Sequence, residues 1–155
     1  MFINSIPNML IIALISLNFV KILFMRLYYQ KERDRNFFEI CESIRKDNHP
    51  DYVSVDTIAR MAIAKEAQSF YLTTEIYARI INEVRCGCLA LVRNKTKKKL
   101  YLELWRRYIQ IKRQNPQLNT TDCARIISEQ KAPQFYISER HATNLYYKLL
   151  KSNPK

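Results

Sequence analysis

The apolar residues of this 155-residue chain recur at helical spacing in several separate stretches. Phe37, Ile40, Cys41 and Ile44 stand at i, i+3, i+4 and i+7, the spacing that gives a helix one buried face. A similar stripe in the second half comprises Tyr101, Leu104, Trp105, Tyr108 and Ile111. A single glycine in the whole chain argues against many tight turns or hairpins, because these need residues with positive φ. The pattern therefore predicts an all-α protein.

An internal repeat divides the chain at an offset of 65 residues. The segment 67–73 returns as 132–138, with the same Phe-Tyr pair at the same place in both copies. Self-similarity of this kind marks a structural unit that occurs twice. We therefore predict two tandem tri-helical modules, residues 33–88 and residues 100–152, joined by a basic linker at 89–99.

Polar residues mark where the helices begin within each repeat. Ser54 and Thr73 precede the second and third helices of the first repeat, where a side-chain oxygen can cap free backbone N–H groups. In the second repeat, Asn119 or Thr120 has that position for the second helix and Ser138 for the third. The caps predict short second helices and longer third helices in both copies.

The connectors between the second and third helices carry Phe70-Tyr71 and Phe135-Tyr136 immediately ahead of a cap. We interpret these pairs as apolar plugs that pack the incoming chain against its module, with base-stacking aromatics as the alternative. Gly87 is placed to end the third helix of the first repeat, since the residue after a helix often adopts the left-handed conformation.

Three short helices, the last entered through a fixed turn, resemble the general plan of helix-turn-helix DNA-binding modules. The chain departs from that plan in its connector, which has about nine residues where the motif has a turn of three or four. The resemblance implies DNA binding through a variant of the motif.

Residues 9–25 form an apolar N-terminal segment interrupted only by Ser16, Asn18 and Lys21. Its length is at the lower limit of a transmembrane helix. Translated from Met1, the chain is predicted to be single-pass membrane-anchored, with its basic part cytoplasmic by the positive-inside rule. Met25 offers an internal start that would give a soluble cytoplasmic protein, and a buried helix is the third interpretation.

Positive charge is concentrated in the second half of the chain. The formal net charge is +12, and residues 91–155 hold 15 bases and four acids. An excess of this kind favours an anionic partner. Because Lys and Arg neutralise phosphates, the second repeat is the expected contact surface for nucleic acid.

The two third helices differ in charge at equivalent positions: Glu75 corresponds to Arg140, and Glu83 to Lys148. In the second copy one polar stripe is formed at i, i+4, i+8 and i+11 by Arg140, Asn144, Lys148 and Lys151. Asn144 has the chemistry to read adenine and Arg140 to read guanine in a major groove. The basic linker and the outer face of the following helix add further bases. The predicted nucleic-acid-binding residues are Arg93, Lys95, Lys97, Lys98, Lys99, Arg106, Arg113, Arg140, Asn144, Lys148 and Lys151.

Two other functions remain open from the sequence. A membrane-anchored interaction or adaptor protein would place its basic face on lipid headgroups or an acidic partner, with membrane contact through residues 9–25. In the DNA-binding function the first repeat packs against the second or binds a partner, so the first repeat is a candidate surface for a protein partner or self-association. RNA binding requires Tyr101, Trp105 and Tyr147 to be exposed for stacking.

The sequence predicts neither an enzyme nor a metal or cofactor site. Cys86-Gly87-Cys88 is a lone CxC without a nearby histidine, which does not match zinc-finger spacing. His49 and His141 lack a carboxylate or thiol at a spacing suggestive of a catalytic triad or metal site. The four cysteines are expected to be free thiols in a reducing cytoplasm.

Overall fold

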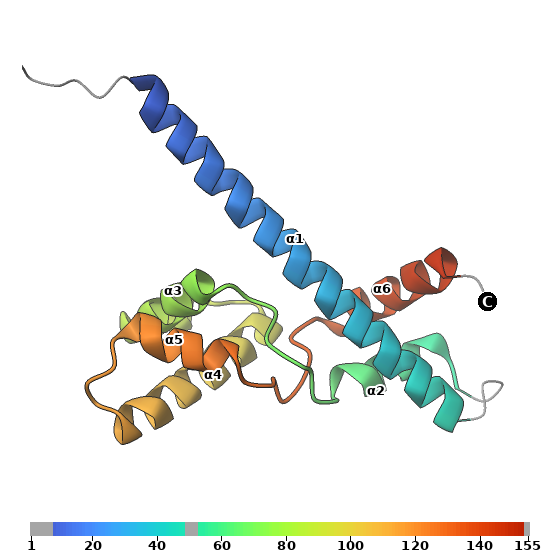
Figure 1. The fold of residues 1–155 in the computed structure, drawn as a ribbon. Helices are drawn as coiled ribbons and strands as arrows, with labels where there is room; N and C mark the ends of the chain where they lie inside the picture. The colour runs from blue at the N-terminus through green and yellow to red at the C-terminus, as the bar shows by residue number, and fades with distance from the viewer. Residues whose placement is uncertain (1–7, 49–52, 154–155) are drawn as a thin grey trace, which may run out of the picture.

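The computed structural model describes residues 8–48 and 53–153, and within α1 it describes the side chains of residues 17, 20, 21 and 23 onward. This part of the chain is helical throughout its regular elements, which confirms the predicted all-α class (Figure 1). The elements are α1 (Asn8–Asp47), α2 (Val55–Ile63), α3 (Thr74–Arg85), the 3-10 turn η1 (Cys88–Leu91), α4 (Lys95–Gln114), α5 (Thr120–Ser128) and α6 (Glu139–Ser152).

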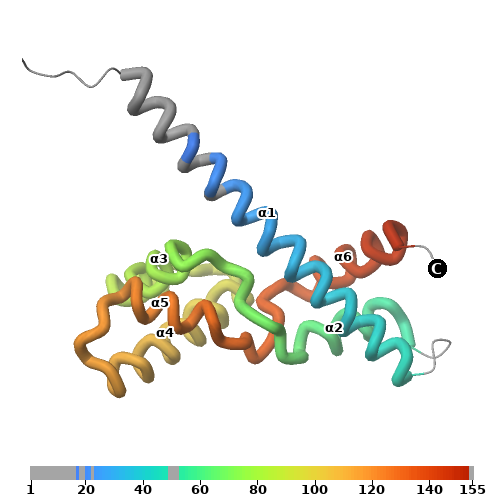
Figure 2. Tube along the Cα trace, in the orientation of Figure 1, coloured from blue at the N-terminus to red at the C-terminus, as the bar shows by residue number. Residues whose placement is uncertain are grey.

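The N-terminal segment and the first helix of the first repeat form one continuous helix, α1, rather than two separate elements. No glycine or proline occurs between residues 8 and 49 of the sequence, so nothing interrupts helical geometry there. The helix ends at Asp47, and Asn48 donates from Nδ2 to the carbonyl of Ile44 at 2.8 Å. The N-terminal part of α1 projects away from the other helices (Figure 2).

The predicted transmembrane segment at 9–25 is only partly described. The side chains of residues 9–16, 18, 19 and 22 lie outside the described part of the chain. Among the residues that the structure describes, no helix combines the length and the apolar character needed to cross a bilayer.

Side-chain caps set the starts of the other helices. Ser54, Thr73 and Ser138 cap α2, α3 and α6 as predicted, and Asn119 rather than Thr120 caps α5. Gly87 follows α3 with a φ of 79°, in the left-handed conformation expected there. The starts of these four helices and the end of α3 are therefore determined by local sequence.

The linker at 89–99 is more structured than the sequence suggested. Its first residues belong to η1, and Asn94 then caps α4, so that Lys95 to Lys99 are helical. The Oδ1 atom of Asn94 accepts a hydrogen bond from the N–H of Lys97 at 2.9 Å. An asparagine ahead of a helix is itself a start signal, although the charge run after it suggested a linker.

The six α-helices in the described part of the chain form two three-helix bundles that exchange their third helices. α6 of the second repeat packs on α1 and α2 of the first, whereas α3 of the first repeat packs on α4 and α5 of the second (Figure 1). The hydroxyl of Tyr146 on α6 donates to Glu42 on α1 at 2.9 Å. Likewise, Tyr101 on α4 donates to Glu83 on α3 at 2.8 Å. The repeat is therefore a sequence unit, and each bundle is assembled from both copies.

The long connectors make this exchange geometrically accessible. A turn of three or four residues would hold the third helix against the second, whereas the ten residues that separate the two helices in each repeat can span at most roughly 35 Å. The connectors meet between the bundles, where Phe70 stacks on Tyr136 with ring centroids 5.8 Å apart. Tyr71 stacks on Phe135 in the equivalent arrangement, with ring centroids 6.2 Å apart. The Phe-Tyr pairs are packing residues, as predicted, and they pack on each other.

Candidate nucleic-acid interface

The first two turns of α4 carry a cluster of exposed lysines. Because the Asn94 cap starts the helix at Lys95, the side chains of Lys95, Lys98 and Lys99 project from this end, and Arg93 precedes it, also exposed. These four side chains make no hydrogen bond or ion pair within the described residues. The first turn of α4 has no acidic residue. Cations at a helix N-terminus oppose the macrodipole, so helix stability does not account for them.

Lys97 is held differently from its neighbours. Its Nζ atom lies 5.2 Å from the centroid of the Tyr101 ring, a cation–π geometry. Tyr101 is in turn fixed by its hydrogen bond to Glu83. Burial is the largest cause, and that hydrogen bond a further one, of the raised pKa of Tyr101. Lys97 is itself exposed, so its ammonium group lies at the surface beside the Tyr101 ring.

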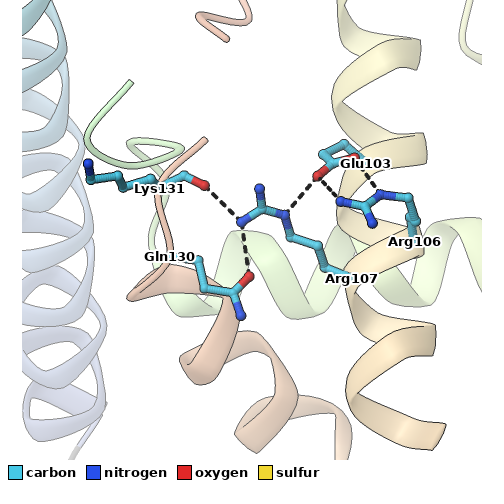
Figure 3. A network of polar contacts seen from close by, with 5 residues as sticks. All are labelled: Glu103, Arg106, Arg107, Gln130 and Lys131. Carbon is cyan, nitrogen blue, oxygen red and sulfur yellow. Dashed lines mark hydrogen bonds and ion pairs between the residues drawn. The ribbon is translucent and has the colours of Figure 1, made fainter. Parts of the chain in front are cut away.

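The middle of α4 is joined to the rest of the molecule by Arg107 (Figure 3). Its guanidinium donates to Glu103 at 2.8 Å, to Gln130 at 2.9 Å and to the carbonyl of Lys131 at 2.8 Å. It also lies over the ring of Phe70, 4.7 Å from the centroid. Only 14% of its side chain is exposed, so Arg107 is a structural residue. The sequence does not predict this structural role, because nothing in it distinguishes Arg107 from the exposed bases of α4.

Arg106 and Arg113 complete the predicted basic face of α4. Arg106 donates two hydrogen bonds to Glu103 (Figure 3), yet its side chain remains 63% exposed. The pKa of the Glu103 carboxyl is lowered, first by Arg106 and also by Arg107. Arg113 is exposed and has no partner among the described residues. Arg113 is therefore available to an anion, and Arg106 only in part.

The predicted stripe of α6 lies on its exposed face. α6 buries Ala142, Leu145 and Tyr146 toward α1 and α2. Its opposite face presents four side chains that are exposed and form no hydrogen bond or ion pair with described residues, namely Arg140, Asn144, Lys148 and Lys151. Tyr147 beside them is 47% exposed. The periodicity of the sequence predicted this face correctly.

The two basic faces belong to different bundles and not to one module, because the exchange places α6 on α1 and α2. Their N-terminal ends converge at a cleft of about 270 Å³. Thr96 and Lys99 of α4 line it together with Arg60 of α2 and Glu139 of α6. Arg60 and Glu139 form an ion pair at 3.9 Å. The stripe on α6 begins at the next residue, Arg140.

The equivalent face of α3 holds two acids and one base, Glu75, Glu83 and Arg79. Arg79 pairs with Glu83 at 3.5 Å, and Glu83 also accepts the hydroxyl of Tyr101. The pKa of Glu75 is lowered, chiefly by a hydrogen bond from the Thr73 side chain. The divergence between the repeats is therefore a difference between α6, with unpaired bases, and α3, with acids engaged in local contacts.

The aromatic residues considered for RNA stacking are mostly not accessible. Tyr101 is 2% exposed. Trp105 is half-buried and stacks on Tyr108 with centroids 5.3 Å apart. Only Tyr147 of the three is exposed. The exposure that RNA binding requires is thus absent at Tyr101 and incomplete at Trp105.

Within the part of the chain that the structure describes, the cysteines and His141 form no cluster. Burial raises the pKa of Cys41 to about 12 and also raises that of Cys123, while Cys86 is exposed. His141 is exposed on α6, and His49 lies outside the described residues. In the described ranges, no group of three or more His, Cys, Asp or Glu is placed to hold a metal ion.

No protein-family model, curated protein or solved structure matches this chain. The proposals below therefore depend on the geometry and charge of the helices described above.

Proposed function

We propose that this chain is a non-enzymatic nucleic-acid-binding protein that contacts double-stranded DNA through α6 and the basic face of α4. The observation that supports this most is a set of unpaired basic side chains on two exposed helix faces. The N-terminal ends of these faces converge at the cleft beside Lys99. Such faces suit phosphate contacts, which supply most of the affinity of non-specific DNA binding.

The two faces would have different tasks. Lys95, Lys98 and Lys99 are placed against the dipole of α4, and a bound phosphate would compensate for that arrangement. On α6, Arg140 and Asn144 have the donor and acceptor pattern that reads base edges, while Lys148 supplies charge one turn later. Phosphate contacts position the protein, and base contacts give specificity.

A duplex is favoured over a single strand by the aromatic residues. Proteins that bind single strands stack bases on exposed aromatic rings. Tyr101 is buried beneath Lys97, and Trp105 is packed on Tyr108. The surface therefore carries many charged and polar groups but few exposed aromatic rings on which bases could stack.

A salt titration tests this function directly. The full chain is titrated into a labelled DNA duplex, and anisotropy is measured between about 50 mM and about 200 mM salt. Duplex binding predicts an affinity that falls steeply over this range, and weaker competition by single-stranded RNA of the same length. No binding at the lowest salt would refute the proposal.

A membrane-associated function is the second candidate, supported by exposed apolar residues on α1. Leu17 is 73% exposed, Val20 62% and Phe24 69%, and the bases Lys21 and Arg26 lie beside them. Contiguous exposed apolar groups with adjacent bases suit a surface of anionic lipid. Flotation with anionic and neutral liposomes, each with and without duplex DNA as competitor, separates the two candidates.

A further inference from the structure

A second basic feature lies between α1 and α3. Here α1, α3 and α4 enclose a cleft of about 340 Å³. Its charged lining consists of Arg26 and Arg33 from α1, Arg79 from α3 and Lys97 from α4, with no acidic residue. This volume is at the lower end of the range for small-molecule sites.

The cleft continues into a second cavity of about 640 Å³ along α1. The two cavities share Arg26, Ile76 and Arg79 in their linings, and the second adds Lys21 and Glu75. Sequence reasoning missed this feature because its cations come from three helices that are far apart in the chain. No spacing within one helix signals such a site.

Two of the four cations that line the cleft already have acidic partners. Arg33 pairs with Asp34 at 2.7 Å, and Arg79 pairs with Glu83. Arg26 makes no ion pair or hydrogen bond with any described residue, and Lys97 contacts only the Tyr101 ring and hydroxyl. Two cations without an acidic partner therefore line one recess.

We propose that this cleft binds a small phosphate monoester, with the phosphate group held by Arg26 and Lys97. A phosphate monoester carries close to two negative charges at neutral pH, which matches the two unpaired cations. Leu72, Ile80 and Leu100 supply an apolar wall for the organic group of the ester. A duplex is too wide for a recess of this volume, so the site is separate from the proposed DNA surface, although Lys97 adjoins both.

The test uses inorganic phosphate and a nucleoside monophosphate as probes, titrated into the full chain by calorimetry. Both probes are expected to bind, the nucleotide more tightly because of the apolar wall. Arg26→Gln should weaken both by about tenfold, the loss of one charge-assisted contact. Lys97→Gln should do the same. Lys31→Gln removes an exposed base of α1 outside the cleft lining and should leave both affinities unchanged.

Two results would overturn the proposal: no binding of either probe at millimolar concentration, or an equal loss in Arg26→Gln and Lys31→Gln. Circular dichroism of each variant establishes that the fold is kept. Arg140→Gln distinguishes the cleft from the DNA surface, because it should weaken duplex binding while phosphate binding is retained. Phosphate binding without duplex binding would support the cleft and refute the proposed function.

Discussion

Ala67 and Ala132 occupy the same position in the two repeats and are hydrogen-bonded to each other. The N–H of Ala67 donates to the carbonyl of Ala132 at 2.9 Å, and the N–H of Ala132 donates back at 3.0 Å. Both residues are 1% exposed. A residue paired with its own counterpart marks a two-fold relation between the copies. The two repeats are therefore arranged as an exchanged dimer within one chain.

This arrangement predicts that neither half of the chain folds alone. A fragment of residues 1–92 contains α1, α2 and α3, but α3 lacks its partners α4 and α5. A fragment of residues 93–155 has the complementary defect, because α6 lacks α1 and α2. We expect the short helices to be largely lost in each fragment alone, namely α2 and α3 in the first and α5 and α6 in the second, since short helices depend on tertiary packing. Mixing the fragments should restore helical circular dichroism with a one-to-one complex.

A second pair of fragments, divided inside a helix, provides the control. Fragments divided at Lys99 interrupt α4 itself and should reassemble less well than those divided before Arg93, where the chain leaves η1. If residues 93–155 alone formed a monomer with full helicity, the exchange of third helices would be wrong.

Arg107 is predicted to be a main stabilising residue of the contact between α4 and the connector that leads into α6. Arg107→Met removes the hydrogen bonds to Glu103, Gln130 and the carbonyl of Lys131. The loss leaves Gln130 and the carbonyl of Lys131 without this donor and Glu103 with Arg106 alone, and it should lower the free energy of unfolding by about 2–3 kcal/mol. Arg106→Met is the matched control, because Arg106 is 63% exposed and should cost about 1 kcal/mol or less. Urea denaturation measures both, and similar losses would contradict the structural role of Arg107.

Local sequence was sufficient for the individual helices but not for their partners. The caps at Ser54, Thr73 and Ser138 follow from side-chain chemistry within a few residues. The exchange does not, because the inner face of α3 is equally apolar whichever bundle receives it. The sole indication of the exchange in the sequence is the length of the connector, and a variant turn explains that length equally well. The continuity of α1 was readable in principle from the absence of glycine and proline between residues 8 and 49.

The sequence likewise predicts one part of the candidate site and not the rest. Polarity and period predicted the exposed stripe from Arg140 to Lys151, because both are properties of one helix. The separation of α6 from α4 follows from the exchange and was not predictable from either repeat alone. The cleft around Arg26 and Lys97 joins three helices across the chain, so only the tertiary structure shows it.

Two tyrosines, Tyr71 and Tyr136, lie where the two connectors meet and predict a loss of stability at alkaline pH. Burial raises the pKa of Tyr71 and of Tyr136 to about 12 from the ordinary value near 10. The hydroxyl of Tyr71 donates to Asn36 Oδ1 at 2.5 Å, a bond that requires the proton. Between about pH 10 and about pH 12 the unfolded chain holds fewer protons than the folded chain, so the free energy of unfolding falls as pH rises.

Denaturation midpoints at about pH 8 and about pH 11 measure this effect. Tyr71→Phe should lower stability at the lower pH, because Asn36 loses a donor, yet it should reduce the further loss on going to the higher pH. Tyr147→Phe, which changes an exposed ring on α6, is the control and should keep the wild-type difference. A pH-independent midpoint in the wild type would contradict the burial of these phenols.

The stripe on α6 predicts two kinds of DNA-binding defect, which separate phosphate contact from base contact. Lys148→Ala removes one exposed charge and should reduce the slope of log affinity against log salt by about 1, equally for all duplex sequences. Asn144→Ala removes no charge, so the salt slope should stay the same, while discrimination at one adenine position falls by about 1–3 kcal/mol. Arg125→Ala on α5, where the side chain already pairs with Asp122 at 3.6 Å, is the control for loss of charge elsewhere. If Arg125→Ala changed the salt slope as much as Lys148→Ala, net charge alone would explain binding, and α6 would have no special role.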